Sequence, residues 1–101
     1  MNVGFIGTGN MGRILVEAFI ESGAIGPSFI YMTNRTLMKA EVINKIYPKT
    51  NVVESAGEVV KRSDIIFICV KPLDIHPLLK KLEPLLTPNK CIISITSPIN
   101  V

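Results

Sequence analysis

The sequence predicts an α/β domain with a doubly wound parallel sheet of about five strands in the order 3-2-1-4-5. Two observations predict this fold class. Short apolar runs alternate with helical patterns along all 101 residues, and a glycine-rich turn joins the first strand to the first helix. That turn has the pattern G-x-G-x-x-G and consists of Gly7-Thr8-Gly9-Asn10-Met11-Gly12. Residues 1–101 are therefore expected to form one domain.

The first strand and helix flank this turn. Val3, Phe5 and Ile6 form an apolar run that is typical of a short buried strand. Apolar residues then recur at helical spacing, which predicts a helix with one apolar face made of Met11, Ile14, Leu15, Ala18 and Phe19. Ser22-Gly23 is typical of a helix C-terminus.

The second and third units repeat this alternation. Residues 29–32 predict a strand, and Thr36 is a candidate N-cap for a helix that ends before Pro48. Its apolar side is expected to carry Leu37, Ala40, Ile43 and Tyr47. Residues 51–53 predict a short third strand. Ser55 and Glu58 have the spacing of a capping box, which predicts a brief helix to about residue 61.

The last two strands flank a further helix. Residues 64–70 predict the fourth strand, whose continuous apolar run, residues 65–70, is expected for a strand covered by helices on both faces. Pro72 is expected to end this strand, and residues 74 to about 82 to form a helix. Residues 91–95 predict the fifth strand.

The glycine turn has the geometry that a dinucleotide requires. Gly7 would permit a tight turn, Gly9 would let a pyrophosphate approach the backbone, and Gly12 would let the helix lie close to the strand. The helix N-terminus adds unpaired N–H groups and the positive end of its dipole. The alternative is a glycine-rich turn that binds nothing.

The turn after the second strand indicates which cofactor is bound. A carboxylate that binds the adenosine ribose in NAD proteins is expected about 20 residues after the last glycine, but none lies between Met32 and Ala40. Asn34-Arg35-Thr36 stands there instead. A guanidinium can hold a 2′-phosphate with two hydrogen bonds, so NADP is favoured over NAD. The alternative is an N-cap threonine that follows a solvated turn.

Val70-Lys71-Pro72 follows the fourth strand at the carboxyl edge, where open α/β sheets bind ligands. Its rigid backbone is suited to contact a nicotinamide, although Lys71 could also be a flanking surface charge.

Composition excludes several other functions. The net charge is +3, but the basic residues are scattered, which argues against nucleic-acid binding. No apolar run approaches the ~20 residues of a membrane span, and the N-terminus has no signal-peptide pattern, so a cytoplasmic protein without a membrane partner is expected. Cys69 and Cys91 are expected to be free thiols and His76 a surface residue. We therefore predict neither a metal site nor a catalytic residue in this chain.

Four motifs together carry a resemblance: Gly4-Phe5-Ile6, the glycine turn, residues 33–36 and Val70-Lys71-Pro72. With them, the chain resembles the pyrroline-5-carboxylate reductase family over essentially its whole length. Residues 67–75 and 93–98 resemble its late competence branch. The resemblance implies NADPH-dependent reduction of 1-pyrroline-5-carboxylate to proline. It also implies that Gly7, Gly9 and Gly12 hold the pyrophosphate, Asn34, Arg35 and Thr36 the 2′-phosphate, and Val70, Lys71 and Pro72 border the nicotinamide.

Two positions depart from the family pattern. Ser97-Pro98 stands where typical members have Ala-Gly, and Ala56 where many have Asn. The family's C-terminal helical dimerisation domain, which carries the residues that bind the imine substrate, is missing from these 101 residues. The chain alone is thus expected to bind cofactor without turnover, and the full-length protein to be a homodimer or larger. A non-catalytic NADP(H)-binding competence protein and a hydroxy-acid dehydrogenase remain alternatives.

Overall fold

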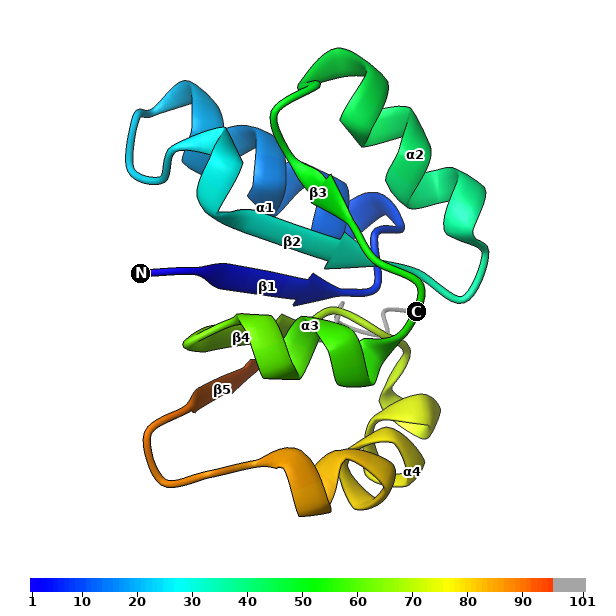
Figure 1. Ribbon diagram of the computed structural model, residues 1–101. Helices are drawn as coiled ribbons and strands as arrows, with labels where there is room; N and C mark the ends of the chain where they lie inside the picture. Colours follow the sequence, from blue (N-terminus) through cyan, green and yellow to red (C-terminus); the bar gives the residue numbers. More distant parts are fainter. Residues whose placement is uncertain (96–101) are drawn as a thin grey trace.

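The computed structural model describes residues 1–95 of the chain. Five parallel strands form one sheet in the order β3-β2-β1-β4-β5, which confirms the predicted topology (Figure 1). The expected departure at Ser97-Pro98 lies outside the described residues. The strands are β1 (Val3–Ile6), β2 (Ile30–Thr33), β3 (Asn51–Val52), β4 (Ile65–Ile68) and β5 (Cys91–Ser94).

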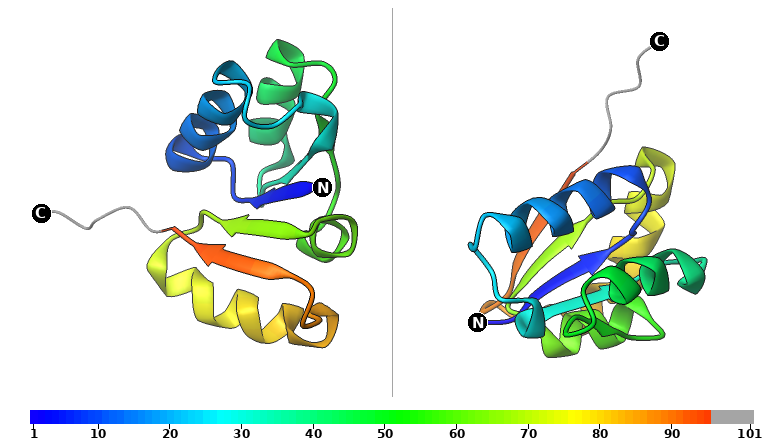
Figure 2. Two further views of the ribbon diagram at one scale, coloured as in Figure 1. Left: turned by 90° about the vertical axis from the view of Figure 1, so that its left-hand side faces the viewer. Right: turned by 90° about the horizontal axis from the view of Figure 1, so that it is seen from above.

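Helices cover both faces of this sheet. They are α1 (Asn10–Glu21), α2 (Leu37–Ile46), α3 (Ala56–Arg62) and α4 (Pro72–Leu82), with short 3-10 turns at Pro27–Phe29 and Glu83–Leu85. Helices α1 and α2 lie on one face and α3 and α4 on the other (Figure 2). This arrangement is the doubly wound fold that the alternating pattern predicts.

The strand register brings the carboxyl ends of the central strands to one level. Ile6, the last residue of β1, is aligned with Thr33 of β2 and Ile68 of β4. Ile68 is in turn aligned with Ser94 of β5. The loops that leave these strands therefore start side by side along one edge of the sheet, where ligands bind in open α/β folds.

Each face of the sheet has its own apolar core. Under α1 and α2, the rings of Phe5 and Phe67 stack with centroids 5.2 Å apart, and Phe19 of α1 packs against both. Under α3 and α4, the buried side chains are Ile6, Val59, Val60, Ile66, Ile68 and Leu82. Alternate residues of β1 and β4 thus point into different cores, as the pleat of a strand requires.

Helix α1 is rotated relative to the face that the spacing predicts. Val16 is completely buried, whereas Ile14 is 59% exposed and Ala18 is also exposed. The prediction was wrong at these positions because the apolar residues of this helix can be grouped into more than one face at helical spacing, and spacing alone does not say which face is buried. Its predicted end is confirmed, since Ser22 is the C-cap and Gly23 has a φ of +77°.

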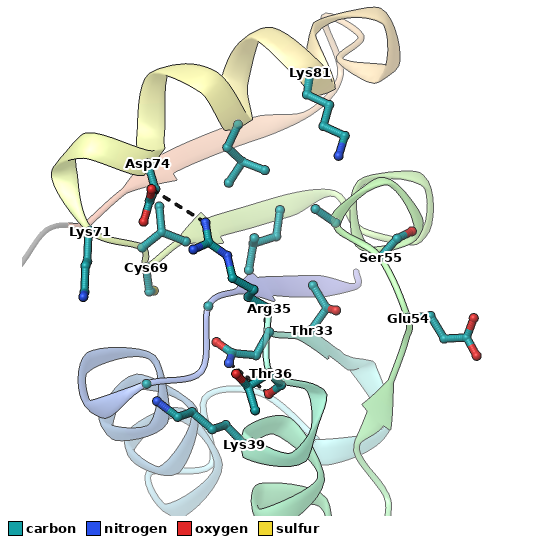
Figure 3. Close-up of a pocket in the computed structure, with 17 residues that line it drawn as sticks. Thr33, Arg35, Thr36, Lys39, Glu54, Ser55, Cys69, Lys71, Asp74 and Lys81 are labelled. Carbon is teal, nitrogen blue, oxygen red and sulfur yellow. Dashed lines mark hydrogen bonds and ion pairs between the residues drawn. The ribbon is translucent and has the colours of Figure 1, made fainter.

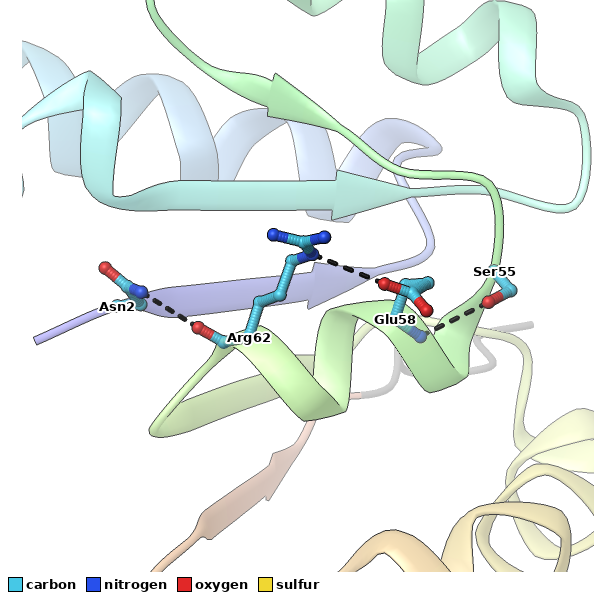
Figure 4. A network of polar contacts seen from close by, with 4 residues as sticks. All are labelled: Asn2, Ser55, Glu58 and Arg62. Carbon is cyan, nitrogen blue, oxygen red and sulfur yellow. Dashed lines mark hydrogen bonds and ion pairs between the residues drawn. The ribbon is translucent and has the colours of Figure 1, made fainter.

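Helix α3 is held at both ends by polar contacts (Figure 4). The Ser55 hydroxyl accepts a hydrogen bond from the Glu58 amide, which confirms the predicted N-cap. The Glu58 carboxylate pairs with Arg62 at 3.3 Å instead of reaching back to Ser55, so only half of the capping box forms. At the other end, the Asn2 side-chain amide donates to the Arg62 carbonyl oxygen.

Two expected boundaries around the fourth strand were wrong. Strand β4 ends at Ile68, and the backbone has left the ladder before Pro72. Pro72 is the first residue of α4 and does not end the strand, which agrees with the preference of proline for the first helical turn. The carboxyl end of β4 is therefore followed by a short connection, residues 69–71, that faces the ligand-binding edge.

The rotation of α1 generates a stability prediction. Val16→Ala should lower the free energy of unfolding by about 1–3 kcal/mol, because it leaves a void in a closed core. Ile14→Ala should change it by less than about 0.5 kcal/mol, since that side chain is mostly in solvent. Urea denaturation of the two variants measures the difference. Equal losses would mean that the face predicted from spacing is the packed one.

Candidate functional site

A cleft of about 630 Å³ opens at the carboxyl edge of the sheet (Figure 3). Three separate segments that the sequence singled out line it together: the glycine turn, the connection between β2 and α2, and the connection between β4 and α4. The lining residues among those predicted are Gly7, Gly9, Asn34, Arg35, Thr36, Val70 and Lys71. Among the described residues of the same segments, Thr8, Met11, Gly12 and Pro72 do not line the cleft.

The turn between β1 and α1 can be built only with glycine at two positions. Gly7 has a φ of +96°, and a Cβ there would collide with the carbonyl oxygen of Cys69. A Cβ on Gly12 would collide with the carbonyl oxygen of Gly7. Any larger residue at Gly12 would therefore push the first turn of α1 away from the end of β1.

Gly9 has a different environment. A Cβ built at this position would have no atom within 4 Å and would project into open space, although Gly9 lines the cleft. Packing does not require a glycine here, so the space beside it is available to a ligand that approaches the backbone closely. This is the cradle that a pyrophosphate needs.

The N-terminus of α1 is suited to an anion. Gly9 is its N-cap and supplies no side chain that could accept from the first N–H groups, and the first turn carries no acidic residue. Those N–H groups and the helix dipole favour a negatively charged ligand. The adjacent Thr8 hydroxyl oxygen is buried and has no hydrogen-bond partner among the described residues.

Asn34 has a structural function that the sequence did not indicate. Its side-chain oxygen accepts a hydrogen bond of 2.8 Å from the Thr8 amide, and its side-chain nitrogen donates to the Thr36 carbonyl oxygen at 3.0 Å. The carboxamide thus ties the glycine turn to the turn after β2. Both loops of the expected binding site are held in register by this one half-buried side chain.

The turn after β2 leaves its other polar groups at the cleft. Thr36 occupies the N-cap position of α2 as predicted, but its side chain makes no capping hydrogen bond. The first turn of α2 contains no acidic residue, and Lys39 from that turn also lines the cleft. The N-terminus of α2, the Thr36 hydroxyl and Lys39 therefore offer donors and positive charge to an anion.

Helices α3 and α4 contribute further lining residues, most of which the sequence analysis did not assign to the site. From the start of α3 and the residues before it come Glu54, Ser55 and Ala56, and from α4 come Asp74, Leu78 and Lys81. The departure at Ala56 therefore lies on the cleft wall. The cleft is lined by four cations (Arg35, Lys39, Lys71 and Lys81) and two carboxylates (Glu54 and Asp74), an excess of positive charge that favours an anionic ligand.

The remaining predictions concern metal binding, membrane-spanning helices, and the cysteines and histidine of the chain. Within residues 1–95, no cluster of three or more His, Cys, Asp or Glu side chains could hold a metal ion. In the same part of the chain, no helix combines the length and the apolar character that crossing a bilayer requires. Cys69 and Cys91 are free thiols, and His76 is an exposed residue of α4, as expected.

The fold and the cleft together define a class of protein. An open parallel sheet, a G-x-G-x-x-G turn at the carboxyl end of β1 and a basic cleft at the switch point of the topology are the features of a dinucleotide-binding domain of an oxidoreductase. The chain belongs to the family described as NADP oxidoreductase, coenzyme F420-dependent, which matches residues 2–98.

Curated relatives agree with this family and with the resemblance in the motifs. The chain is 54% identical over 99 residues to ComE operon protein 4 of Bacillus subtilis, covering 98% of the chain and 36% of that protein. It is 36% identical over 93 residues to pyrroline-5-carboxylate reductase of Methanobrevibacter smithii, covering 92% of the chain and 37% of that protein. The predicted kinship is confirmed, and the chain spans little more than a third of these relatives.

Solved structures show the same domain. A pyrroline-5-carboxylate reductase from Coxiella burnetii matches with a TM-score of 0.85 and 29% identity, over 94% of this chain and 35% of that one. The pyrroline carboxylate reductase of Plasmodium falciparum with NADP bound matches with a TM-score of 0.79 and 26% identity, over 100% and 35% of the two chains. The Rossmann-type architecture predicted from the sequence is thereby confirmed.

The link made by Asn34 can be tested by amide exchange. Asn34→Ala should lower the free energy of unfolding by about 1–2 kcal/mol, because two backbone groups lose their partner. It should also accelerate hydrogen exchange of the Thr8 amide in NMR spectra. Asn44→Ala is the matched control, since Asn44 donates to two oxygens of Thr50 far from the glycine turn. If both variants accelerate Thr8 exchange equally, Asn34 does not hold the turn specifically.

Partial burial lowers the thiolate fraction of Cys69 at neutral pH. Partial burial at the cleft raises its pKa from the ordinary 9.0 to about 11, because the thiolate is poorly solvated there. In a Cys91→Ser variant, alkylation by iodoacetamide should accelerate about tenfold per pH unit from pH 8 and level off only near pH 11. In urea it should level off near pH 9. Below pH 9 the thiol is protonated in both the folded and the unfolded protein, and its full contribution to the free energy of unfolding is present. This contribution is lost as the pH rises from 9 through 11, because the unfolded thiol ionises at a lower pH than the folded one. A native plateau near pH 9 would show that Cys69 is solvated.

Proposed function

We propose that the cleft binds NADP(H) and that the chain is the cofactor-binding domain of an NADPH-dependent reductase that converts 1-pyrroline-5-carboxylate into proline. The observation that carries the proposal is the meeting of two anion-binding features in one cleft: an open glycine cradle at α1 and a turn without acidic residues at α2. Both features line the same cleft, as a dinucleotide whose adenosine carries a further phosphate would require. The relatives named as pyrroline-5-carboxylate reductases support the reaction.

The residues of the chain have distinct positions in this proposal. The glycine turn, Gly7-Thr8-Gly9-Asn10-Met11-Gly12, holds the pyrophosphate on the N-terminus of α1. Arg35 and Thr36 hold the 2′-phosphate, while Asn34 orients both turns. Val70, Lys71 and Pro72 border the nicotinamide at the end of β4. When bound, NADPH supplies a hydride for the C=N carbon of the cyclic imine.

Catalysis in this proposal needs more than these 101 residues. Relatives are almost three times as long as the chain, which covers 36% of ComE operon protein 4. We assign binding of the imine and dimerisation, or assembly into a larger homo-oligomer, to a helical domain that follows the cofactor domain in a full-length protein. The full-length protein is proposed to be cytoplasmic, where NADPH is available.

A regulatory protein is the second candidate function. The 54% identity to ComE operon protein 4 exceeds the identity to the named reductases reported above. The departure from the family pattern at Ser97-Pro98 also favours this candidate. In this alternative the cleft binds NADP(H) without catalysis. NADPH oxidation by a dimeric full-length protein, followed with 1-pyrroline-5-carboxylate, separates the two candidates. Turnover supports the reductase, and a flat trace with intact cofactor binding supports the regulator.

Cofactor preference is measured by calorimetric titration with NADPH and NADH in parallel. NADPH should bind more tightly, because only it presents a 2′-phosphate to the turn after β2. Arg35→Ala should weaken the binding of NADPH by about 1.5–3 kcal/mol and leave the binding of NADH nearly unchanged. Equal losses for both cofactors would show that Arg35 does not contact the 2′-phosphate. A folded protein that binds neither cofactor would contradict the proposed function.

A further inference from the structure

Arg35 extends across the mouth of the cleft toward α4. Its guanidinium Nη2 lies 3.6 Å from Oδ1 of Asp74, so the pair joins the turn after β2 to the first turn of α4 (Figure 3). Both side chains line the cleft. The group expected to hold the 2′-phosphate is thus paired with a carboxylate on the opposite wall.

This ion pair is weak enough to be exchanged. The Arg35 side chain is 84% exposed, and 3.6 Å is longer than a hydrogen bond between a guanidinium and a carboxylate. Exposed pairs of this kind contribute little to stability. A phosphate has more charge and can accept two parallel hydrogen bonds from the same guanidinium, which makes it the better partner.

The negative charge of Asp74 is stabilised independently of Arg35. The residue lies in the first turn of α4, where the positive end of the helix dipole stabilises a carboxylate. When Arg35 turns to a phosphate, this carboxylate stays at the cleft. It therefore competes with the phosphate for the guanidinium.

We propose that Asp74 is a specificity-determining residue that reduces the preference of the cleft for NADPH over NADH by pairing with Arg35. The inference rests on the proposed function, since it assumes that the cleft binds these dinucleotides. Binding of NADPH exchanges the contact between Arg35 and Asp74 for a contact between Arg35 and the 2′-phosphate. Binding of NADH needs no such exchange, so the loss of the carboxylate affects NADH less.

The cleft offers a matched control. Glu54 also lines it and is exposed, but it forms no ion pair within residues 1–95. Glu54→Gln removes the same charge from the same cleft without releasing Arg35. Asp74→Asn keeps the shape of the side chain, and Arg35→Gln removes the partner.

The experiment measures dissociation constants of the full chain for NADPH and NADH by calorimetry, for the wild type and for D74N, E54Q, R35Q and R35Q/D74N. D74N should raise the ratio of NADPH to NADH affinity by about two- to fivefold, and E54Q by less than about 1.5-fold. Adding D74N to R35Q should change the ratio no more than E54Q does. Higher salt should reduce the D74N effect, because exposed charges are screened.

Other results would overturn the inference. If D74N lowers the preference for NADPH, Asp74 positions Arg35 for the phosphate instead of competing with it. If the full D74N effect persists in the R35Q background, the carboxylate acts without Arg35. Both results leave NADPH binding by the wild type intact and so leave the proposed function standing, whereas a wild type that binds neither cofactor removes both proposals. Far-UV circular dichroism and unfolding midpoints show that each variant is folded.

Discussion

The close contact between the end of β1 and the start of α1 is the constraint on which the rest of the structure depends. The backbone at Gly12 lies against the carbonyl oxygen of Gly7, and the backbone at Gly7 lies against that of Cys69 at the end of β4. Two glycines thereby bring a helix N-terminus, a central strand and its neighbour to one point. Because the strand ends are level, this point is also where the other loops of the carboxyl edge converge. The candidate site is a direct result of this packing.

The cleft combines backbone groups that packing fixes with side-chain charges that are exposed to solvent. Its floor consists of the glycine turn and strand ends, and the carboxamide of Asn34 joins that floor to the turn after β2. Its rim carries long cationic side chains and two carboxylates on connections and helix starts. In the proposed function, the backbone donors would define where an anion binds, and the exposed charges would adjust how strongly different anions are attracted. These two contributions come from different parts of the chain.

Much of this organisation could be predicted from the sequence, because alternation of elements and the glycine pattern both depend on local spacing. The topology, the end of α1 at Gly23 and the three segments around the cleft follow from such patterns. The buried face of α1 could not be predicted in this way, because Ile14 and Val16 both fit a helical apolar face almost equally well. Asp74 was also missed as a cleft residue. It meets Arg35 only because β2 and β4 both pair with β1, which brings the turn after β2 and the start of α4 to the same edge of the sheet, and no local pattern contains such a long-range contact.

The position of Asn34 has a consequence for the evolution and redesign of cofactor preference. Residues that follow the second strand are the natural place to exchange one dinucleotide for the other, yet the first of them here also carries a hydrogen bond to the glycine turn. Replacing the whole segment would alter the phosphate cradle together with the preference. Substitutions at Arg35, Thr36 and Lys39 should therefore disturb the glycine turn less than substitutions at Asn34, because within the described residues their side chains make no such hydrogen bond to the turn. Lineages that change cofactor on this scaffold should keep an amide at that position or acquire a second tether first.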